Sequence, residues 1–258
     1  MSLTARQIIV TGGGTGIGRA VAAAFAEQGD QVVITGRRKG VLADTAAELG
    51  PTVRAVAFDA ADPAQVAAAL AELPDQVDVL VNNAGGNTDI GAEPAEGRAE
   101  PAEGLPVVDA LDALAAAWLA NLNANLLSAV LVTTALRERL RPGGAVINLS
   151  SIAAHRGGSG SYGAAKAAVE AWNLTLAQQL GPEGITANVI APGYIEETEF
   201  FGAGIAPERR AWNIANALNQ RAGTPADIAG TALYLASPAA SHLTGQTLHI
   251  NGGTFSGR

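Results

Sequence analysis

The chain has 258 residues, 48% of them hydrophobic, with a formal net charge of −8 and no cysteine. This acidic balance argues against binding to nucleic acid, whose phosphates require a basic face, and against binding to anionic membranes. The lack of cysteine excludes a disulfide framework, a thiol nucleophile and a cysteine-based metal site, and we expect His155, His242 and His249 not to cluster, so no metal is predicted.

The amino terminus passes from MSLTAR directly into a first strand, without the long apolar segment of a signal peptide. We also expect no stretch of the chain to be long and apolar enough to span a bilayer. The sequence therefore predicts a cytoplasmic protein that has no membrane partner.

Seven strand-like apolar runs alternate with helical patterns along the chain. They lie at about 7–11, 31–36, 52–58, 77–82, 144–150, 185–191 and 246–250. Such nearly continuous apolar runs are typical of strands buried on both faces, and the alternation with helices requires right-handed parallel crossovers. The predicted fold is α/β, with residues 1–258 forming a single Rossmann-like doubly wound domain whose mostly parallel seven-stranded sheet is flanked by helices.

The first strand ends in a glycine-rich turn that leads into an alanine-rich helix. The pattern is T-G-x-x-x-G-x-G and not the strict G-x-G-x-x-G, because position 17 is Ile. Glycines allow a tight turn and let backbone N–H groups approach a pyrophosphate at the positive end of the helix. We therefore expect a dinucleotide site formed by Thr11, Gly12, Gly14, Thr15, Gly16, Ile17 and Gly18.

The second strand ends at Gly36, followed by Arg37 and Arg38. Guanidinium groups bind a dianionic 2′-phosphate, whereas the acid that holds the ribose diol of NAD would repel it. NADP (NADPH) is therefore the expected cofactor, and NAD is less favoured. Against this choice, arginines are common at the start of surface helices, and the glycine loop has Thr15 at a position where many enzymes that use NADPH have a second basic residue.

The later strands also end in polar or small residues. Asp59-Ala60 follows the third strand, Asn82-Asn83-Ala84-Gly85 the fourth, Ser150-Ser151 the fifth and Pro192-Gly193 the sixth. Open α/β sheets bind ligands beyond the carboxyl ends of their strands, so these residues are expected to converge. The stretch 86–106, in which EPAEG occurs twice, is expected to be an exposed loop, and a role at the mouth of the pocket stays open.

Tyr162 and Lys166 lie four residues apart in an alanine-rich segment predicted to be helical over 161–180. Residues at this spacing share a helix face, so the ammonium group should lie beside the phenol. A nearby cation lowers the pKa of a tyrosine from about 10 toward the range in which it can transfer protons. Together with Ser151, the pair predicts general acid catalysis.

These motifs, in this order and spacing from Ile8 to about Gly253, resemble those of the short-chain dehydrogenases/reductases. The carboxy-terminal run is most similar to that of the 3-oxoacyl-thioester reductases. The resemblance implies that Asp59 and Ala60 lie near adenine and that Asn83, Ala84 and Gly85 line the adenosine ribose. It also places Pro192, Gly193, Ile195 and Thr198 near the nicotinamide, although Thr198 comes one position late in the motif.

The resemblance further implies a catalytic set of Asn125, Ser151, Tyr162 and Lys166. Asn125 follows Trp118 by seven residues, with Asn121 and Asn123 as competitors. The interval between Ser151 and Tyr162 is about two residues short, which leaves Ser150 as an alternative. Tyr162 would protonate the substrate oxygen that Ser151 holds, and Lys166 would tune Tyr162 and bind the nicotinamide ribose. Asn125 would hold a water chain to Lys166, whereas Asn82 could be structural.

The predicted function is NADPH-dependent reduction of a ketone, or oxidation of the corresponding secondary alcohol, with a small-molecule ketone or thioester as substrate. Glu183 stands where carrier-protein reductases often have a basic residue, which favours a free ketone or a coenzyme A thioester. The alternative is a catalytically silent scaffold or sensor.

Residues 194–220 form either a lid over substrate or ordinary core. Apolar faces at about 108–140 and 160–180 predict a homotetramer or homodimer.

Overall fold

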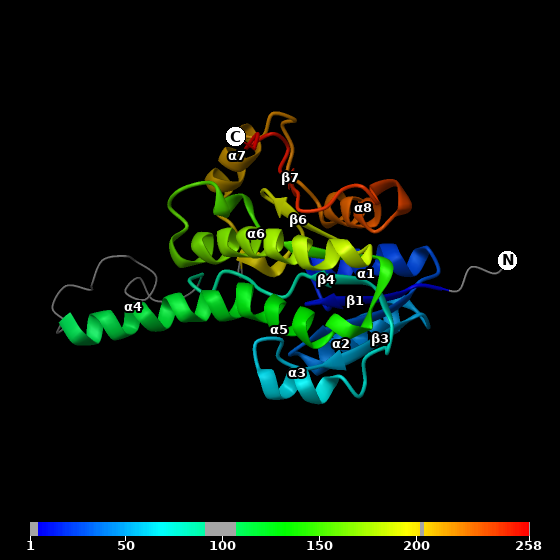
Figure 1. The fold of residues 1–258 in the computed structure, drawn as a ribbon. Coiled ribbons are helices and arrows are strands. Elements are labelled where there is room, and N and C mark those ends of the chain that lie inside the picture. The colour runs from blue at the N-terminus through cyan, green and yellow to red at the C-terminus, as the bar shows by residue number, and fades with distance from the viewer. Residues whose placement is uncertain (1–4, 91–106, 202–203, 258) are drawn as a thin grey trace.

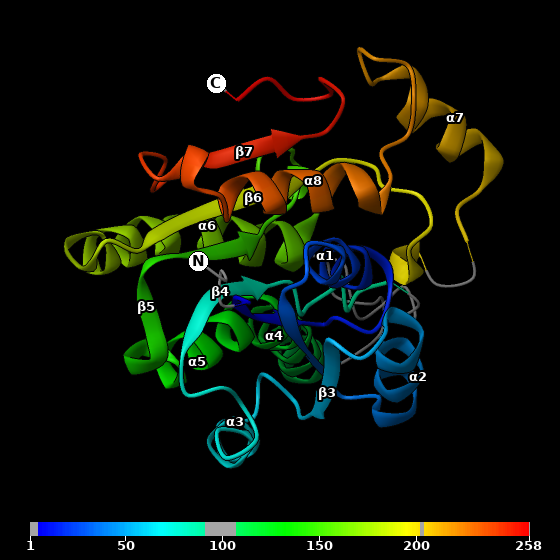
Figure 2. The same cartoon turned by 90° about the vertical axis from the view of Figure 1, so that its right-hand side faces the viewer.

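A computed structural model describes residues 5–90, 107–201 and 204–257. Seven strands form one sheet in the order β3-β2-β1-β4-β5-β6-β7, and Figure 2 shows them following one another from β7 at the top to β3 at the bottom. Every neighbouring pair is parallel, which confirms the predicted doubly wound fold. The strands are β1 Gln7–Thr11, β2 Gln31–Gly36, β3 Val53–Ala57, β4 Val77–Asn82, β5 Leu140–Leu149, β6 Thr186–Pro192 and β7 Thr247–Ile250.

The central strands are apolar on both faces because helices cover both. Ile8, Ile9 and Val10 in β1 are all fully buried. Successive side chains of a strand point to opposite faces, so Ile8 and Val10 join one core cluster and Ile9 joins another. This double burial is why the strands read as continuous apolar runs and not as an alternating pattern.

The helices form two layers. The first contains α1 Gly16–Glu27, α2 Lys39–Leu49 and α8 Pro225–Leu235, and the second contains α3 Pro63–Ala69, α5 Ser128–Ala135 and α6 Gly160–Leu180. A π-helical turn at Asn123–Leu127 joins α4 Val107–Leu122 to α5, and Figure 1 shows this long run beside α6. The reversal of strand order between β1 and β4 opens a crevice at the carboxyl edge.

Helix α7, Pro207–Ala215, stands outside these layers, at the upper right of Figure 2. It has no buried residue, and Trp212 is 53% exposed. Ordinary core packing, one of the two readings of 194–220, therefore does not describe this helix.

The run Val107–Ala135 corrects the expectation that no segment could span a bilayer. Its 29 residues form one helical stretch whose most apolar window has a mean hydropathy of 1.4, which is enough by length and composition alone. Leucine and valine give this run most of its hydropathy, but Asp109, Asp112 and several asparagines interrupt it in the sequence. A single such helix is weak evidence of a membrane span, because helices of soluble proteins pass the same test.

Candidate active site

A cleft of about 940 Å³ opens at the carboxyl ends of the strands. It brings together all the predicted site residues except two, Thr11 and Asn125, which are buried beneath its surface. The predicted residues that line it are Gly12, Gly14, Thr15, Gly16, Ile17, Gly18, Arg37, Arg38, Asp59, Ala60, Asn83, Ala84, Gly85, Ser151, Tyr162, Lys166, Pro192, Gly193, Ile195 and Thr198.

The glycine turn is shaped for a phosphate group. Gly12 and Gly16 have φ of 64° and 51°, which glycine adopts without strain. A Cβ on Gly18 would lie 2.2 Å from the carbonyl oxygen of Gly12, so no other residue fits there. Thr15 makes no capping hydrogen bond to α1, and the first turn of that helix has no acid. The N–H groups at this end of α1 therefore suit a pyrophosphate.

Thr11 and Asn83 hold this turn against β4. The hydroxyl of Thr11 accepts hydrogen bonds of 3.0 Å from the backbone N–H groups of Asn83 and Ala84. The Asn83 amide in turn donates to the carbonyl oxygens of Thr11 and Gly12, each at 3.0 Å. Thr11 thus supports the glycine turn from below and does not face the cleft.

Tyr162 and Lys166 in α6 lie at the surface of the cleft and are almost fully buried, with exposed fractions of 6% and 5%. The Lys166 Nζ lies over the Tyr162 ring, 5.8 Å from its centroid, and donates to the carbonyl oxygen of Leu149 at 2.9 Å. The predicted contact between the two side chains therefore forms on the helix face where the spacing put it.

The predicted lowering of the Tyr162 pKa does not hold in this geometry. Burial raises the pKa of the phenol to about 12, and a hydrogen bond with Ser151 offsets only part of that increase. Burial also lowers the pKa of Lys166 to about 8. The correction has a physical cause: both groups lose hydration, and the ammonium group is bonded to a backbone carbonyl and not to the phenol oxygen.

The two serines that end β5 have different partners. Ser151 is hydrogen-bonded to Tyr162, whereas Ser150 is buried and its hydroxyl lies within hydrogen-bond distance of two acceptors, the Lys166 carbonyl at 3.0 Å and a Glu170 carboxylate oxygen at 2.6 Å. This pattern favours Ser151 over Ser150 as the residue that meets substrate.

Asn125 lies in the π-helical turn and has its amide fully engaged. Its oxygen accepts from the Gly86 N–H at 3.0 Å, and its nitrogen donates to the carbonyls of Gly86 and Asn121, each at 2.9 Å. The competitor Asn123 does line the cleft. The bonds from Asn125 hold Gly86, and with it the start of the segment 86–90, in place at the cleft. Both copies of EPAEG lie outside the described residues.

Of two polar networks around the cleft, the first was not anticipated from the sequence, and the second supports the structural reading of Asn82. Asn121 donates to Asp89 at 2.8 Å and to Ser161 at 2.9 Å. Ser161 directly precedes Tyr162 in the chain. Below the cleft, the Asn82 amide donates to Asn148 at 2.8 Å and to the hydroxyl of Thr133, which makes Asn82 a brace between β4, β5 and α5. The sequence signal for the second network was the presence of Asn82 and Asn148 in otherwise apolar strands.

The arginines after β2 have unequal surroundings. Both line the cleft, but Arg38 forms an ion pair of 2.6 Å with Glu199, a residue that the sequence reasoning did not single out. Arg37 makes no ion pair within the described part of the chain.

Thr198 lies beside the glycine turn, since a Cβ atom on Gly16 would be 3.4 Å from the Thr198 side chain.

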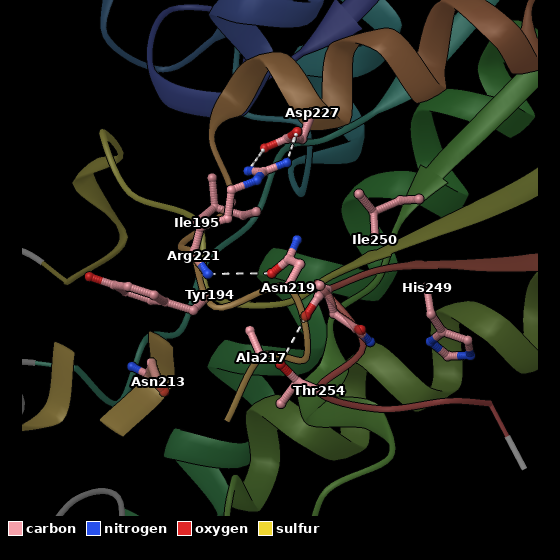
Figure 3. Close-up of a pocket in the computed structure, with 13 residues that line it drawn as sticks. Tyr194, Ile195, Asn213, Ala217, Asn219, Arg221, Asp227, His249, Ile250 and Thr254 are labelled. Atoms are coloured by element: carbon pink, nitrogen blue, oxygen red, sulfur yellow. Dashed lines mark hydrogen bonds and ion pairs between the residues drawn. The ribbon is translucent and has the colours of Figure 1, made fainter. Parts of the chain in front are cut away.

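A second cavity, of about 240 Å³, shares Ile195 with the cleft. Figure 3 shows it between α8 and the carboxy-terminal tail, with Arg221 paired to Asp227 at 2.7 Å. His249, which lines it, packs against His155 with ring centroids 4.8 Å apart.

The contact between His155 and His249 corrects the expectation that the histidines stay apart. Phe255 stacks on His155 at 4.7 Å, and burial lowers the pKa of His249. Within 5–90, 107–201 and 204–257 there is still no group of three or more His, Cys, Asp or Glu that could hold a metal.

Comparisons with known proteins agree with this geometry. A family described as enoyl-(acyl carrier protein) reductase matches residues 12–254. The 3-oxoacyl-[acyl-carrier-protein] reductase FabG of Vibrio harveyi is 32% identical over 99% of each chain.

Two solved structures are similar over nearly their whole length. A short-chain dehydrogenase/reductase from Brucella melitensis has a TM-score of 0.84 at 28% identity, covering 98% of this chain and 97% of its own. A blue fluorescent protein from a metagenomic library, in complex with NADPH, has a TM-score of 0.81 at 32% identity, covering 99% and 100%. With a family match across nearly the whole sequence and full-length relatives above 30% identity, the chain belongs to the short-chain dehydrogenase/reductase family of oxidoreductases.

Proposed function

We propose that this oxidoreductase reduces a ketone with NADPH, or oxidises the corresponding secondary alcohol. The observation that carries the proposal is the buried cluster of Ser151, Tyr162 and Lys166 in the same cleft as the glycine turn. The fit of that turn to a pyrophosphate supports a dinucleotide, and the two arginines after β2 favour NADPH over NADH.

Several parts of the cleft would hold NADPH. Gly12–Gly18 would bind the pyrophosphate, Asp59 and Asn83–Gly85 the adenosine, and Arg37 with Arg38 the 2′-phosphate. Ala60, Pro192, Gly193, Ile195 and Thr198 would complete the contacts, the last four beside the nicotinamide. Bound there, NADPH supplies the hydride for the reaction.

The catalytic side chains act on the substrate oxygen. The Tyr162 phenol, whose pKa of about 12 keeps it protonated, donates its proton to the oxygen as negative charge develops there. The Ser151 hydroxyl holds the same oxygen, and a fixed donor of this kind contributes roughly 3 to 4 kcal/mol to catalysis. Lys166, with a pKa of about 8, is proposed to resupply the proton through a water chain near Asn125 and to bind the nicotinamide ribose.

The substrate is proposed to be a free ketone or a coenzyme A thioester. The name of FabG from Vibrio harveyi describes a reductase of 3-oxoacyl groups on a carrier protein, which supports a 3-oxoacyl thioester. Glu183, expected to repel an acidic carrier, is paired with Arg137 in the structure. The pair offsets much of that repulsion, so a carrier-bound substrate belongs in the same test.

We further propose a cytoplasmic homo-oligomer with one catalytic domain per chain. Support for the oligomer comes from α4, where Val107, Val108, Leu111 and Leu119 are all more than half exposed. Apolar side chains gathered along one helix usually pack against a partner.

The test of the proposed function is an NADPH-oxidation screen over β-keto thioesters, diketones, quinones and cyclic ketones. Tyr162→Phe should reduce turnover of any substrate found by roughly 100-fold or more, because it removes the proton donor. Its affinity for NADPH should stay nearly unchanged, since Gly12–Gly18 hold the pyrophosphate. A Tyr162→Phe variant with full activity would contradict the assigned chemistry, and a protein that binds NADPH but reduces none of these compounds would favour a silent scaffold.

A further inference from the structure

A short turn after β6, Glu199–Phe201, reaches across the mouth of the cleft to the first two helices. In Figure 2 it is the small yellow helix beside α1 and above α2. The Glu199 carboxylate binds the Arg38 guanidinium at 2.6 Å and 3.4 Å, and it accepts a hydrogen bond from the Thr15 hydroxyl at 3.2 Å. We call Glu199, Arg38 and Thr15 the acidic clasp.

The acidic clasp joins segments that are 161 and 184 residues apart in the chain. Arg38 precedes α2 and Thr15 lies in the glycine turn, so both donors belong to the part of the cleft assigned to the dinucleotide. The contact lowers the pKa of the Glu199 carboxyl, because the neighbouring guanidinium stabilises its charged form.

A carboxylate and a 2′-phosphate compete for the same donors. Both are anions that pair with a guanidinium through two oxygens and accept bonds from a hydroxyl. If both bound Arg38 at once they would repel each other. The clasp therefore engages the guanidinium group that the proposed function assigns to the 2′-phosphate.

We propose that Glu199 limits the preference for NADPH by holding Arg38 in place of the 2′-phosphate, so that NADPH must displace it to bind. This inference rests on the proposed function, since it takes NADPH to be the cofactor. Displacement opens the acidic clasp and frees the Glu199–Phe201 turn. NADH has no 2′-phosphate and leaves the clasp closed.

Phe200 connects this exchange to the catalytic tyrosine. It follows Glu199 directly, and its ring lies 5.7 Å from the ring of Tyr162, tilted by 54°. A turn that leaves Arg38 would carry Phe200 with it and change the contact between the two rings. Binding of the 2′-phosphate would thus reach the surroundings of Tyr162 through Phe200.

The clasp is suited to such an exchange because its ion pair is exposed. The Arg38 and Glu199 side chains are 57% and 59% exposed. Surface ion pairs of this kind contribute little to folding stability, so removing one partner should leave the fold intact. A variant at Glu199 can therefore be compared with the parent protein directly.

The experiment measures dissociation constants of NADPH and NADH by fluorescence titration at low ionic strength. Glu199→Gln should bind NADPH about fivefold to tenfold more tightly than the parent, with NADH affinity unchanged, because the competing charge is gone while the shape is kept. Glu197→Gln is the matched control, since it removes the same charge two residues away. In the background of Arg38→Gln, Glu199→Gln should have no further effect on NADPH binding.

Hydrogen exchange supplies a readout independent of affinity. In the parent protein, NADPH should increase the exchange of backbone amides in the segment 196–201, whereas NADH should not. Adenosine 2′,5′-bisphosphate should act like NADPH, and adenosine 5′-monophosphate like NADH.

The outcomes separate the two proposals. If the parent and Glu199→Gln both bind NADPH and NADH equally, the assigned cofactor preference is wrong and the acidic clasp is only a surface ion pair. If NADPH is preferred but Glu199→Gln behaves like Glu197→Gln, the cofactor assignment stands and the competition is overturned. Weaker NADPH binding by Glu199→Gln would also overturn it, because Glu199 would then assist the phosphate.

Discussion

At Tyr162 two influences on the pKa of the phenol oppose each other. Burial raises it, and the hydrogen bond with Ser151 lowers it by less, so the pKa stays at about 12. A phenol that remains protonated at neutral pH is a proton donor, which suits reduction of a carbonyl. Oxidation of an alcohol needs the phenolate, so the rate of that reverse reaction should rise with pH.

The burial of Lys166 makes the stability of the fold depend on pH. Its pKa falls from 10.5 to about 8 on burial, and at about 1.4 kcal/mol per tenfold change in proton affinity this costs about 3 kcal/mol while the group is charged. The folded state binds fewer protons between pH 8 and 10.5, so this group's contribution to stability rises with pH across that window. Chemical denaturation should show Lys166→Met gaining stability over the parent at pH 7 and losing that advantage by pH 10.5.

The same lysine should be needed for both binding and turnover. Lys166→Ala is expected to lose activity and also to weaken NADPH binding, because the ammonium group is proposed to hold the nicotinamide ribose. Fluorescence titration against Tyr162→Phe separates the two effects. Unchanged NADPH affinity in Lys166→Ala would exclude the ribose contact, even with catalysis lost.

Arg37 allows a test of the cofactor preference that is independent of the acidic clasp. It lines the cleft, and its guanidinium has no ion-pair partner in the described chain. Arg37→Asp should reverse the order of affinities, since a carboxylate repels the 2′-phosphate and can accept bonds from a free ribose diol. Titrations of NADPH and NADH give the two dissociation constants, and equal affinities in the parent would refute the preference itself.

Among the elements, the π-helical turn Asn123–Leu127 decides where two neighbouring asparagines point. The extra residue in this turn places Asn125 against the backbone of Gly86, while Asn123 faces the cleft. Asn121, in the preceding helix α4, meets Asp89. Such turns often occur at functional sites. The arrangement fixes the start of the 86–90 segment relative to α6.

Replacing Asn125 should therefore affect stability as well as activity. Asn125→Ala removes one buried and two partly buried hydrogen bonds and leaves backbone groups of Gly86 unpaired, which should lower the free energy of unfolding by about 2 to 4 kcal/mol. Asn123→Ala is the control, because its side chain lines the cleft, and its melting temperature should match that of the parent. If Asn123→Ala alone lost activity, it would replace Asn125 as the functional asparagine.

The strands were predictable because burial on both faces leaves an unbroken apolar run in the sequence. All seven were placed within a few residues of their observed bounds, and only β5 begins earlier, at Leu140, where it pairs with Val77. The π-helical turn was not predictable, since a pattern with a period of 3.6 residues does not reveal one extra residue. The glycine turn and the Tyr162 motif were found because their spacing is local.

Contacts between distant segments were out of reach of the sequence. Glu199 meets Arg38 across 161 residues, and Asn121 meets Ser161 across 40, with no local pattern that signals either contact. The pKa of Tyr162 also depended on burial by the whole fold, which the nearby lysine could not indicate. What was missed is therefore the chemistry that arises only after folding.

For the whole molecule, the exposed apolar residues of α4 contrast with a net charge of −8. Light scattering at micromolar concentration should give the mass of a homotetramer or homodimer, because a second copy could cover these residues. Leu119→Glu should shift the mass toward that of a monomer. Leu218→Glu, at a site that is 80% exposed outside α4, should not. A monomeric parent would contradict the prediction.

The tie between Thr11 and Asn83 has a consequence for the nascent chain during protein synthesis. Each of these hydrogen bonds spans about 70 residues, with separations of 71 to 73 positions. A growing chain that has completed β1, α1 and β2 already contains the glycine turn but lacks the partner that fixes it. We expect such a chain to gain dinucleotide affinity only once β4 and the residues after it have been made, so the cofactor could not assist the earliest steps of folding.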